Sequence, residues 1–156
     1  ISGDLFYVSF DSNMVGSSDG VAFTFGDETD PTFHTPDYPY AVNDFDGYMV
    51  VFDTFHNASD PGTGDFVGLR KIGDDWPYDL LSYDTSIPNL NDGVDHNYEI
   101  WMDSGRLQVA IDGTDYIDYD IPDYDYDEIL VGWGGHNGGL TGTVTIDNLV
   151  IDCSAD

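Results

Sequence analysis

Short runs of β-branched and aromatic residues recur along the whole chain, and glycine, aspartate, asparagine or proline closes each run. Such runs, with residues that favour turns between them, indicate β-strands. No stretch of a dozen residues places apolar side chains at helical spacing, so the sequence predicts no helix. Strands are predicted at residues 4–10, 20–26, 48–54, 66–72, 79–84, 97–102, 106–112, 115–121, 128–134 and 143–152.

Two connections and one apolar run indicate how these strands are arranged. Asp103-Ser104-Gly105 and Asp112-Gly113 each turn the chain between two strands, as is typical of hairpins. Residues 49–52 are apolar on both faces, which predicts a central strand. Ten strands without a helix favour an all-β fold, a two-sheet antiparallel jelly-roll sandwich. Because no internal repeat or linker interrupts the chain, we expect one domain over residues 1–156.

The charge balance of this acidic protein argues against several kinds of partner. Three cations face 31 acids, which gives a formal net charge of −28. Such a chain repels a phosphate backbone, so nucleic acid is not expected as a partner, and anionic membrane surfaces are disfavoured. Only three of the acids are glutamates, and the aspartates that remain suit turns and metal-binding loops. Most of these aspartates are expected to be solvated surface charge.

Membrane insertion and a disulfide framework are not expected either. No run approaches the roughly 18 apolar residues that a membrane-spanning helix needs. Residues 1–10 show no signal peptide. Cys153 is the only cysteine, so no disulfide can form within this chain.

The segment Asp53-Thr54-Phe55-His56-Asn57-Ala58-Ser59-Asp60-Pro61 is the strongest candidate for a metal site. It follows an apolar strand directly and offers carboxylates, an amide and backbone carbonyls within eight residues. These hard oxygen ligands suit Ca²⁺ better than zinc or copper. Gly62 and Gly64 let the loop fold back, and Asp65 adds a further carboxylate. The alternative is chance, because an aspartate-rich chain produces such spacings without a metal.

This segment resembles the metal-binding loop of legume-type (L-type) lectins, in which a strand ends in Glu-x-Asp-Thr-(Phe/Tyr)-x-Asn and Asp-Pro follows. Three further segments resemble that family in the same order. Residues 18–25 are similar to its Asp-Gly-(Leu/Ile)-Ala-Phe strand, residues 96–113 to its central hairpin, and residues 131–151 to its last strands. The resemblance covers roughly residues 4–152 and implies the concanavalin A-like jelly roll.

The resemblance also implies two adjoining sites. Calcium would be held by Asp53, the Phe55 carbonyl, Asn57 and Asp60, to which the spacing adds Asp65. The residues of the implied carbohydrate site are Asp19, Gly20, Phe55, Asn57, His136, Asn137 and Gly138. Asp19 and Asn57 would bind vicinal hydroxyls while Phe55 stacks on the sugar ring. The glycine-rich loop at residues 134–139 would set which sugar fits.

Departures from the family pattern change two expectations. Val51 stands where the family has the glutamate of a transition-metal site, and Phe66 aligns where a histidine is expected, so we expect calcium alone. The family's leading strands have no counterpart before Ile1. Since the first strand of this fold pairs beside the last, residues 143–152 would have an open edge. Either residues 1–10 or a segment from a neighbouring molecule could fill it.

Asn57-Ala58-Ser59 is also an N-glycosylation sequon. Asn57 cannot both carry a glycan and ligate calcium, so the two interpretations compete. Catalysis is not expected. Glucanases that share this sandwich need two carboxylates close together, usually glutamates on one strand, and Glu28, Glu99 and Glu128 do not share one.

The sequence therefore predicts a calcium-dependent, lectin-like carbohydrate-binding domain that is secreted or displayed on a cell surface. Its partner would be a carbohydrate or glycoconjugate. The alternative is a structural subunit of an extracellular filament or surface layer, a homo-polymer joined through the open edge strand.

Overall fold

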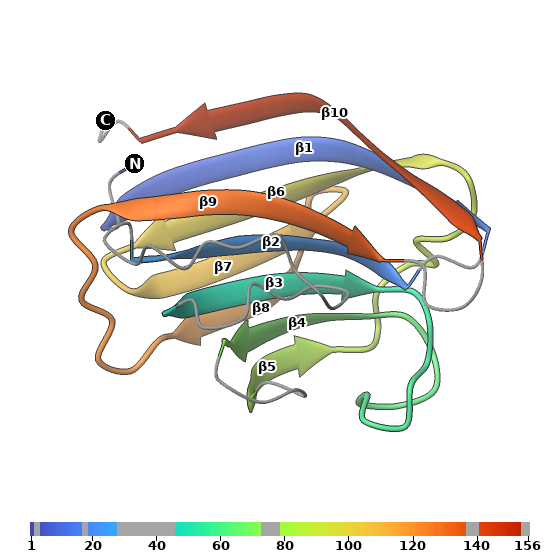
Figure 1. Ribbon diagram of the computed structural model, residues 1–156, viewed down its shortest axis with the longest axis horizontal. Helices are drawn as coiled ribbons and strands as arrows, with labels where there is room; N and C mark the ends of the chain where they lie inside the picture. The colour runs from blue at the N-terminus through green and yellow to red at the C-terminus, as the bar shows by residue number, and fades with distance from the viewer. Residues whose placement is uncertain (2–3, 17–18, 28–45, 73–78, 137–140, 154–156) are drawn as a thin grey trace.

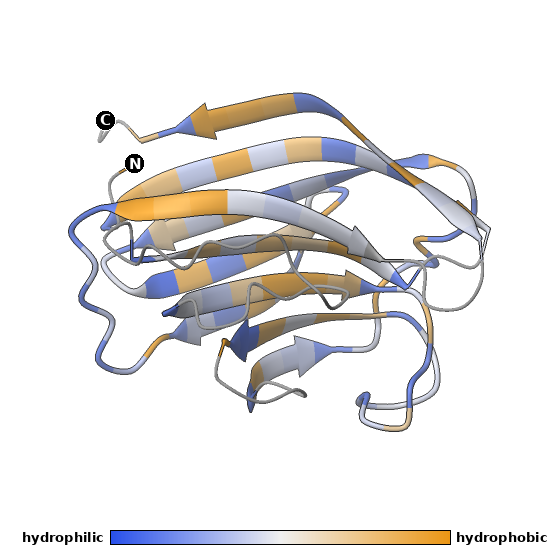
Figure 2. Ribbon diagram, viewed as in Figure 1, coloured by the Kyte–Doolittle hydropathy of each residue, from blue (hydrophilic) through white to orange (hydrophobic). Residues whose placement is uncertain are grey.

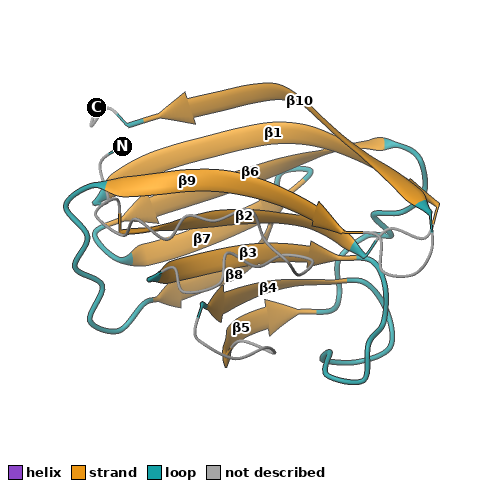
Figure 3. Cartoon of the chain, in the orientation of Figure 1, coloured by secondary structure: helices purple, strands orange, loops and turns teal. Residues whose placement is uncertain are grey.

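The computed structural model describes residues 1, 4–16, 19–27, 46–72, 79–136 and 141–153. In this part of the chain all ten predicted strands form, and Figure 3 shows them joined by loops without a helix. Accordingly, none of the described residues belongs to a helix that could cross a membrane. The strands are β1 (Leu5–Gly16), β2 (Gly20–Asp27), β3 (Gly47–Asp53), β4 (Phe66–Lys71), β5 (Asp79–Asp84), β6 (Asp95–Asp103), β7 (Arg106–Ile111), β8 (Thr114–Asp120), β9 (Ile129–His136) and β10 (Gly142–Asp152).

The strands build two five-stranded sheets that pack face to face (Figure 1). The first, which we call the β1 sheet, has the order β10-β1-β6-β7-β8, and the second, the β3 sheet, has the order β5-β4-β3-β2-β9. All pairings within both sheets are antiparallel. The predicted two-sheet antiparallel sandwich is thus confirmed.

Period-two alternation positions the side chains of the β1 sheet. Along β1, Phe6, Val8 and Phe10 are buried in the core, whereas the residues between them face outward and are partly exposed. The core that they enter is rich in aromatic rings. Tyr98 of β6 packs on Phe10 with ring centroids 5.1 Å apart and on Phe52 of the opposite sheet at 4.5 Å. Each such buried ring stabilises the sandwich by about 1.5–3 kcal/mol.

β3 is buried at every residue and lies at the centre of its sheet, as its run of apolar residues predicts. Val50 and Phe52 enter the main core. Met49 and Val51 point to the other face, where they form a second, smaller apolar cluster with Phe66 and others. The end of this doubly buried strand, Asp53, is therefore a carboxylate placed at the edge of an apolar environment.

β10 is the edge strand of the β1 sheet among the described residues (Figure 1). Its one neighbour there is β1, so the N-terminal strand fills the position beside residues 143–152 that the sequence left open. The far edge of β10 has no partner strand in the described part of the chain. Ile146, Leu149, Val150 and Ile151 are 39–49% exposed on it, and the apolar stretch is visible in Figure 2.

Candidate functional site

Three segments that the sequence assigned to a metal and sugar site meet at one end of the β3 sheet. Gly20, at the start of β2, is the register partner of Asp53, at the end of β3. The backbone N–H of Thr54 donates to the carbonyl of Asp19 at 3.0 Å, which ties the two segments together. On the other side of β2, Gly20 pairs with His136, the last residue of β9. Residues far apart in the sequence thus lie side by side.

Gly20 allows this close approach. Its φ is +128°, a conformation that residues with a side chain rarely adopt. A Cβ atom at this position would lie 2.0 Å from the carbonyl oxygen of Phe52, well inside contact distance. Gly20 is therefore a structural requirement of the junction between β2 and β3, and it keeps Asp19 beside the end of β3.

Asp53 and Asp19 are buried, with exposed fractions of 5% and 7%. The pKa of the Asp53 carboxyl is raised to about 8, chiefly by burial and in smaller part by the neighbouring carboxylates of Asp60 and Asp19. The backbone N–H of Phe55, which donates to Asp53 Oδ1 at 2.9 Å, and the Arg70 guanidinium oppose that rise in pKa. The balance shows that the positive charge near Asp53 is too small to keep it ionised.

The loop after β3 is folded upon itself by the predicted ligands. The backbone N–H of Asn57 donates to Asp60 Oδ2, and the backbone N–H of Asp60 donates to the Asn57 carbonyl at 3.1 Å. The Asn57 amide donates through Nδ2 to the Phe55 carbonyl at 3.2 Å. Phe55 itself is 40% exposed, so its ring is accessible beside the buried Asp53.

Arg70 is a site residue that the sequence analysis missed. It lies on β4, is 3% exposed, and places Nη2 3.8 Å from Asp60 Oδ1. Arg70 is one of three cations in a chain with 31 acids, and it directly follows the uncharged, buried run Phe66–Leu69 of the same strand. Because a buried charge requires a partner, that position could have indicated a carboxylate nearby.

Asp65 is not part of the same cluster. Its Oδ2 accepts the backbone N–H of Leu90 at 2.9 Å, so the carboxylate fixes the segment that precedes β6. Asp65 is also absent from the groups that act on the pKa of Asp53. Asn137 and Gly138, the other predicted sugar-site residues, lie outside the described residues.

The donor set of the loop fits calcium by its chemistry. Asp53 and Asp60 supply carboxylates and Phe55 supplies a carbonyl, and calcium prefers such oxygen ligands. The mutual repulsion that helps to raise the pKa of Asp53 is the kind that a divalent cation relieves. In the arrangement described, no three His, Cys, Asp or Glu side chains of the described residues are grouped closely enough to hold a metal ion.

The two glutamates among the described residues, Glu99 and Glu128, lie apart from this site. Glu99 faces outward on β6 of the opposite sheet, where its Oε1 accepts the Tyr7 hydroxyl at 2.9 Å. Glu128 is exposed immediately before β9. Glu28 lies outside the described residues.

Neither a protein-family profile nor a characterised protein matches the sequence, but solved structures match the fold. The exoplasmic/lumenal domain of VIP36, in its Ca²⁺/Man3GlcNAc-bound form, has a TM-score of 0.76 at 15% identity, over 98% of this chain and 70% of that one. The carbohydrate recognition domain of Emp47p has a TM-score of 0.77 at 14% identity, over 97% and 73%. The carbohydrate-binding module CBM66 from Bacillus subtilis has a TM-score of 0.58 at 15% identity, over 97% and 77%.

These likenesses show the fold. The chain has the concanavalin A-like jelly roll of L-type lectin domains, as the sequence resemblance implied. In this chain the loop after β3, the junction before β2 and the end of β9 come together at one end of that sandwich.

Proposed function

We propose that this chain is a carbohydrate-binding domain in which the loop of residues 53–60 holds a calcium ion beside the sugar site. The observation that supports this most is the meeting of Asp19 with Asp53 at the junction of β2 and β3. The two residues belong to separate sequence motifs, and each motif independently resembles its counterpart in L-type lectins. Chance spacing in an aspartate-rich chain gives no reason for both to meet at one point.

Asp53, the Phe55 carbonyl, Asn57 and Asp60 would hold the calcium ion. Bound calcium would supply positive charge beside the buried carboxylate of Asp53, whose pKa is raised in the metal-free fold. Arg70 keeps a cation on the far side of Asp60 at all pH values of interest, and so orients that carboxylate. Hydrogen bonds within the loop link Asp53 to Phe55, and Asn57 to both Phe55 and Asp60, before any ion arrives.

The sugar would bind over the same turn. The Asp19 carboxylate would accept hydrogen bonds from hydroxyl groups, the Asn57 amide would donate to or accept from them, and the exposed Phe55 ring would cover the apolar face of the pyranose. His136, the last residue of β9 and the register partner of Gly20, would select among sugars together with Asn137 and Gly138, which follow it in the sequence. VIP36 has been solved with mannose bound, which makes mannose oligosaccharides the first ligands to test.

We further infer that Asn57 serves as a ligand and not as a glycan acceptor. Its side chain and backbone both take part in the hydrogen bonds that close the loop. A glycan would take one of the two N–H donors of Nδ2 and place a bulky group beside the Phe55 carbonyl that this nitrogen now contacts. Intact-mass measurement of protein secreted from a glycosylating host tests this directly, because a mass equal to that of the bare chain is expected.

A location outside the cell suits this function. The matching VIP36 domain is exoplasmic or lumenal. A net charge of −28 also favours surroundings rich in salt or divalent cations, which screen the charge. We therefore place the domain on the cell surface or in the extracellular space.

The test is a calorimetric titration with CaCl₂, followed by a glycan array that includes mannose oligosaccharides, with calcium or with EDTA. We expect calcium-dependent sugar binding that Asp53→Asn and Asp19→Asn each abolish. Asp115→Asn, an exposed carboxylate on β8 of the other sheet, serves as the matched control and should bind normally. An array without a single hit in the presence of calcium would contradict the proposal.

The alternative function, a subunit of an extracellular filament, draws support from β10. This strand has an open far edge in the described part of the chain and four exposed apolar residues, and such an edge can accept a strand from another molecule. Light scattering distinguishes the two functions. A monomer near 17.2 kDa rules out the filament, whereas long polymers that survive chelation and are abolished by Val150→Lys would favour it.

A further inference from the structure

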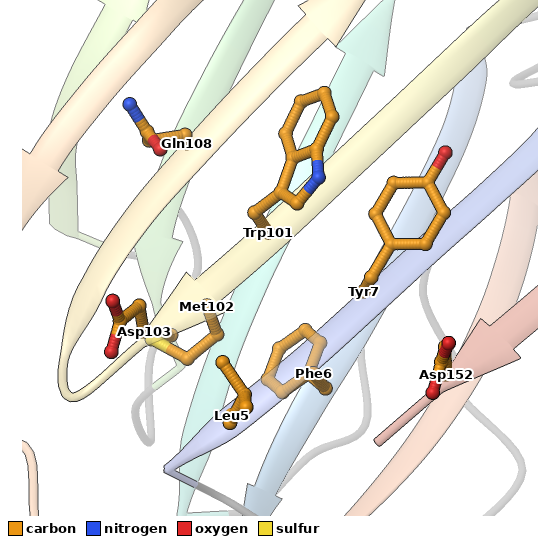
Figure 4. A pocket seen from close by; sticks show the side chains of 8 residues that line it. All are labelled: Leu5, Phe6, Tyr7, Trp101, Met102, Asp103, Gln108 and Asp152. Carbon is orange, nitrogen blue, oxygen red and sulfur yellow. The ribbon is translucent and has the colours of Figure 1, made fainter. Parts of the chain in front are cut away.

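An aromatic pair stands on the outward face of the β1 sheet, on the opposite sheet from the proposed calcium loop. Tyr7 of β1 and Trp101 of β6 are register partners, and their ring centroids lie 5.3 Å apart with 35° between the planes. Both side chains are half-buried. Figure 4 shows the two rings side by side, rising from neighbouring strands.

Polar groups flank the pair in one row across the sheet. Register places Asp152 of β10 beside Tyr7, and Gln108 of β7 beside Trp101. Together with Asp103 at the end of β6, these residues line a hollow of about 440 Å³ (Figure 4). Across four adjacent strands the row thus consists of the Asp152 carboxylate, the Tyr7 and Trp101 rings, and the Gln108 amide.

Neighbouring hydrogen bonds hold this row in place. The Tyr7 hydroxyl donates to Glu99 Oε1 at 2.9 Å, which fixes the ring at its far end. Gln108 is hydrogen-bonded to Asp118, and Asp118 accepts two bonds of 2.6 Å from Arg106. A site whose groups are already ordered loses less conformational entropy when it binds a ligand.

We propose that this row is a second carbohydrate site, independent of metal, which binds a neutral oligosaccharide lying across β10, β1, β6 and β7. Aromatic faces cover the C–H faces of sugar rings, and the polar groups at both ends of the row can exchange hydrogen bonds with hydroxyls. With their centroids 5.3 Å apart, the two rings form one continuous apolar surface between these polar groups. The carboxylates of Glu99, Asp103 and Asp152 surround the rings without a cation in the lining, and they repel uronic or sulfated sugars.

The experiment is a titration in EDTA, so that the loop of residues 53–60 cannot contribute calcium-dependent binding. Cellohexaose, mannohexaose, maltohexaose and a neutral glycan array are the probes, with hexagalacturonate as the anionic comparison. We expect at least one neutral glycan to bind and hexagalacturonate not to bind. Trp101→Ala should weaken that binding at least tenfold, and Trp101→Phe, which keeps an aromatic face, should weaken it less.

Two control variants separate this site from other surfaces and from the calcium site. Tyr83→Ala removes a 54% exposed ring from β5 and should leave binding unchanged. Asp53→Asn should also leave it unchanged, so failure of the calcium-dependent function does not affect this result. Absence of binding to every neutral probe in EDTA, or equal binding by folded Trp101→Ala and wild type, would overturn the proposal.

Discussion

Replacing Asp53 by asparagine should stabilise the metal-free protein at neutral and alkaline pH. Asparagine has the shape of aspartate, and its Oδ1 can still accept the Phe55 N–H bond of 2.9 Å. The variant therefore removes the ionisable carboxyl group and leaves the packing of the loop in place. Its effect is expected to grow with pH, because the pKa of Asp53 is about 8 in the fold.

The sign follows from where the proton is held. In the unfolded chain Asp53 loses its proton above its ordinary pKa of 3.8, whereas in the fold it keeps the proton until about pH 8. Unfolding therefore releases a proton throughout this interval, and stability falls as pH rises through it. For one proton released on unfolding, each pH unit lowers the free energy of unfolding by about 1.36 kcal/mol. Between pH 5 and pH 8 the free energy of unfolding of wild type should thus fall by about 4 kcal/mol more than that of Asp53→Asn.

Urea denaturation in EDTA at several values between pH 5 and pH 8 measures this difference. The other carboxylates also make stability depend on pH, but they are shared by both proteins and cancel in the comparison. With calcium present, wild type should become more stable than Asp53→Asn, because calcium binds the ionised carboxylate and stabilises wild type alone. If the two proteins lose stability in parallel from pH 5 to pH 8, the assignment of a protonated Asp53 is wrong.

Three further outcomes are expected. Gly20→Ala should lower the free energy of unfolding by on the order of 3 kcal/mol or more, because the new Cβ would lie 2.0 Å from the Phe52 carbonyl oxygen. Gly64→Ala, where a Cβ meets nothing within 4 Å, is the control, and equal melting temperatures for the two variants would contradict this prediction. The melting temperature of wild type should rise between 0.1 and 2 M NaCl as salt screens the charge of −28, so a flat profile refutes the repulsion argument. At equal ionic strength CaCl₂ should raise the melting temperature more than NaCl does, and Asp53→Asn should remove that excess without changing the NaCl response.

The sequence was sufficient to predict the strands because two independent signals agree. Period-two alternation places Phe6, Val8 and Phe10 on one side of β1, and turn residues mark where strands end. Strand ends were less certain, since β1 continues to Gly16 while the prediction stopped at residue 10. Residues 11–16 are mostly polar or small, and it is pairing with β6 and β10 that keeps them extended.

Spacing alone predicted the candidate calcium ligands only where they are close in sequence, from Asp53 to Asp60. Asp19, Gly20 and His136 were expected only because of the family resemblance. Arg70 and Asp65 depend on long-range geometry. Arg70 contacts Asp60 because β4 pairs with β3, the strand that precedes the loop. The hydrogen bond between Asp65 and Leu90 joins two separate loops. Neither relation has a signature in local spacing.

The aromatic row on the β1 sheet shows which sequence signal was available and unused. Alternation in β6 buries Tyr98, Ile100 and Met102, which leaves Trp101 on the outward face. A tryptophan at a position that faces solvent is informative, because a ring of that size gains most by burial. Its partner Tyr7 could not have been assigned in the same way, since the register between β1 and β6 joins segments more than 90 residues apart. An outward tryptophan on a predicted strand is thus a local reason to search for a binding face, while the partners that complete the face require the structure.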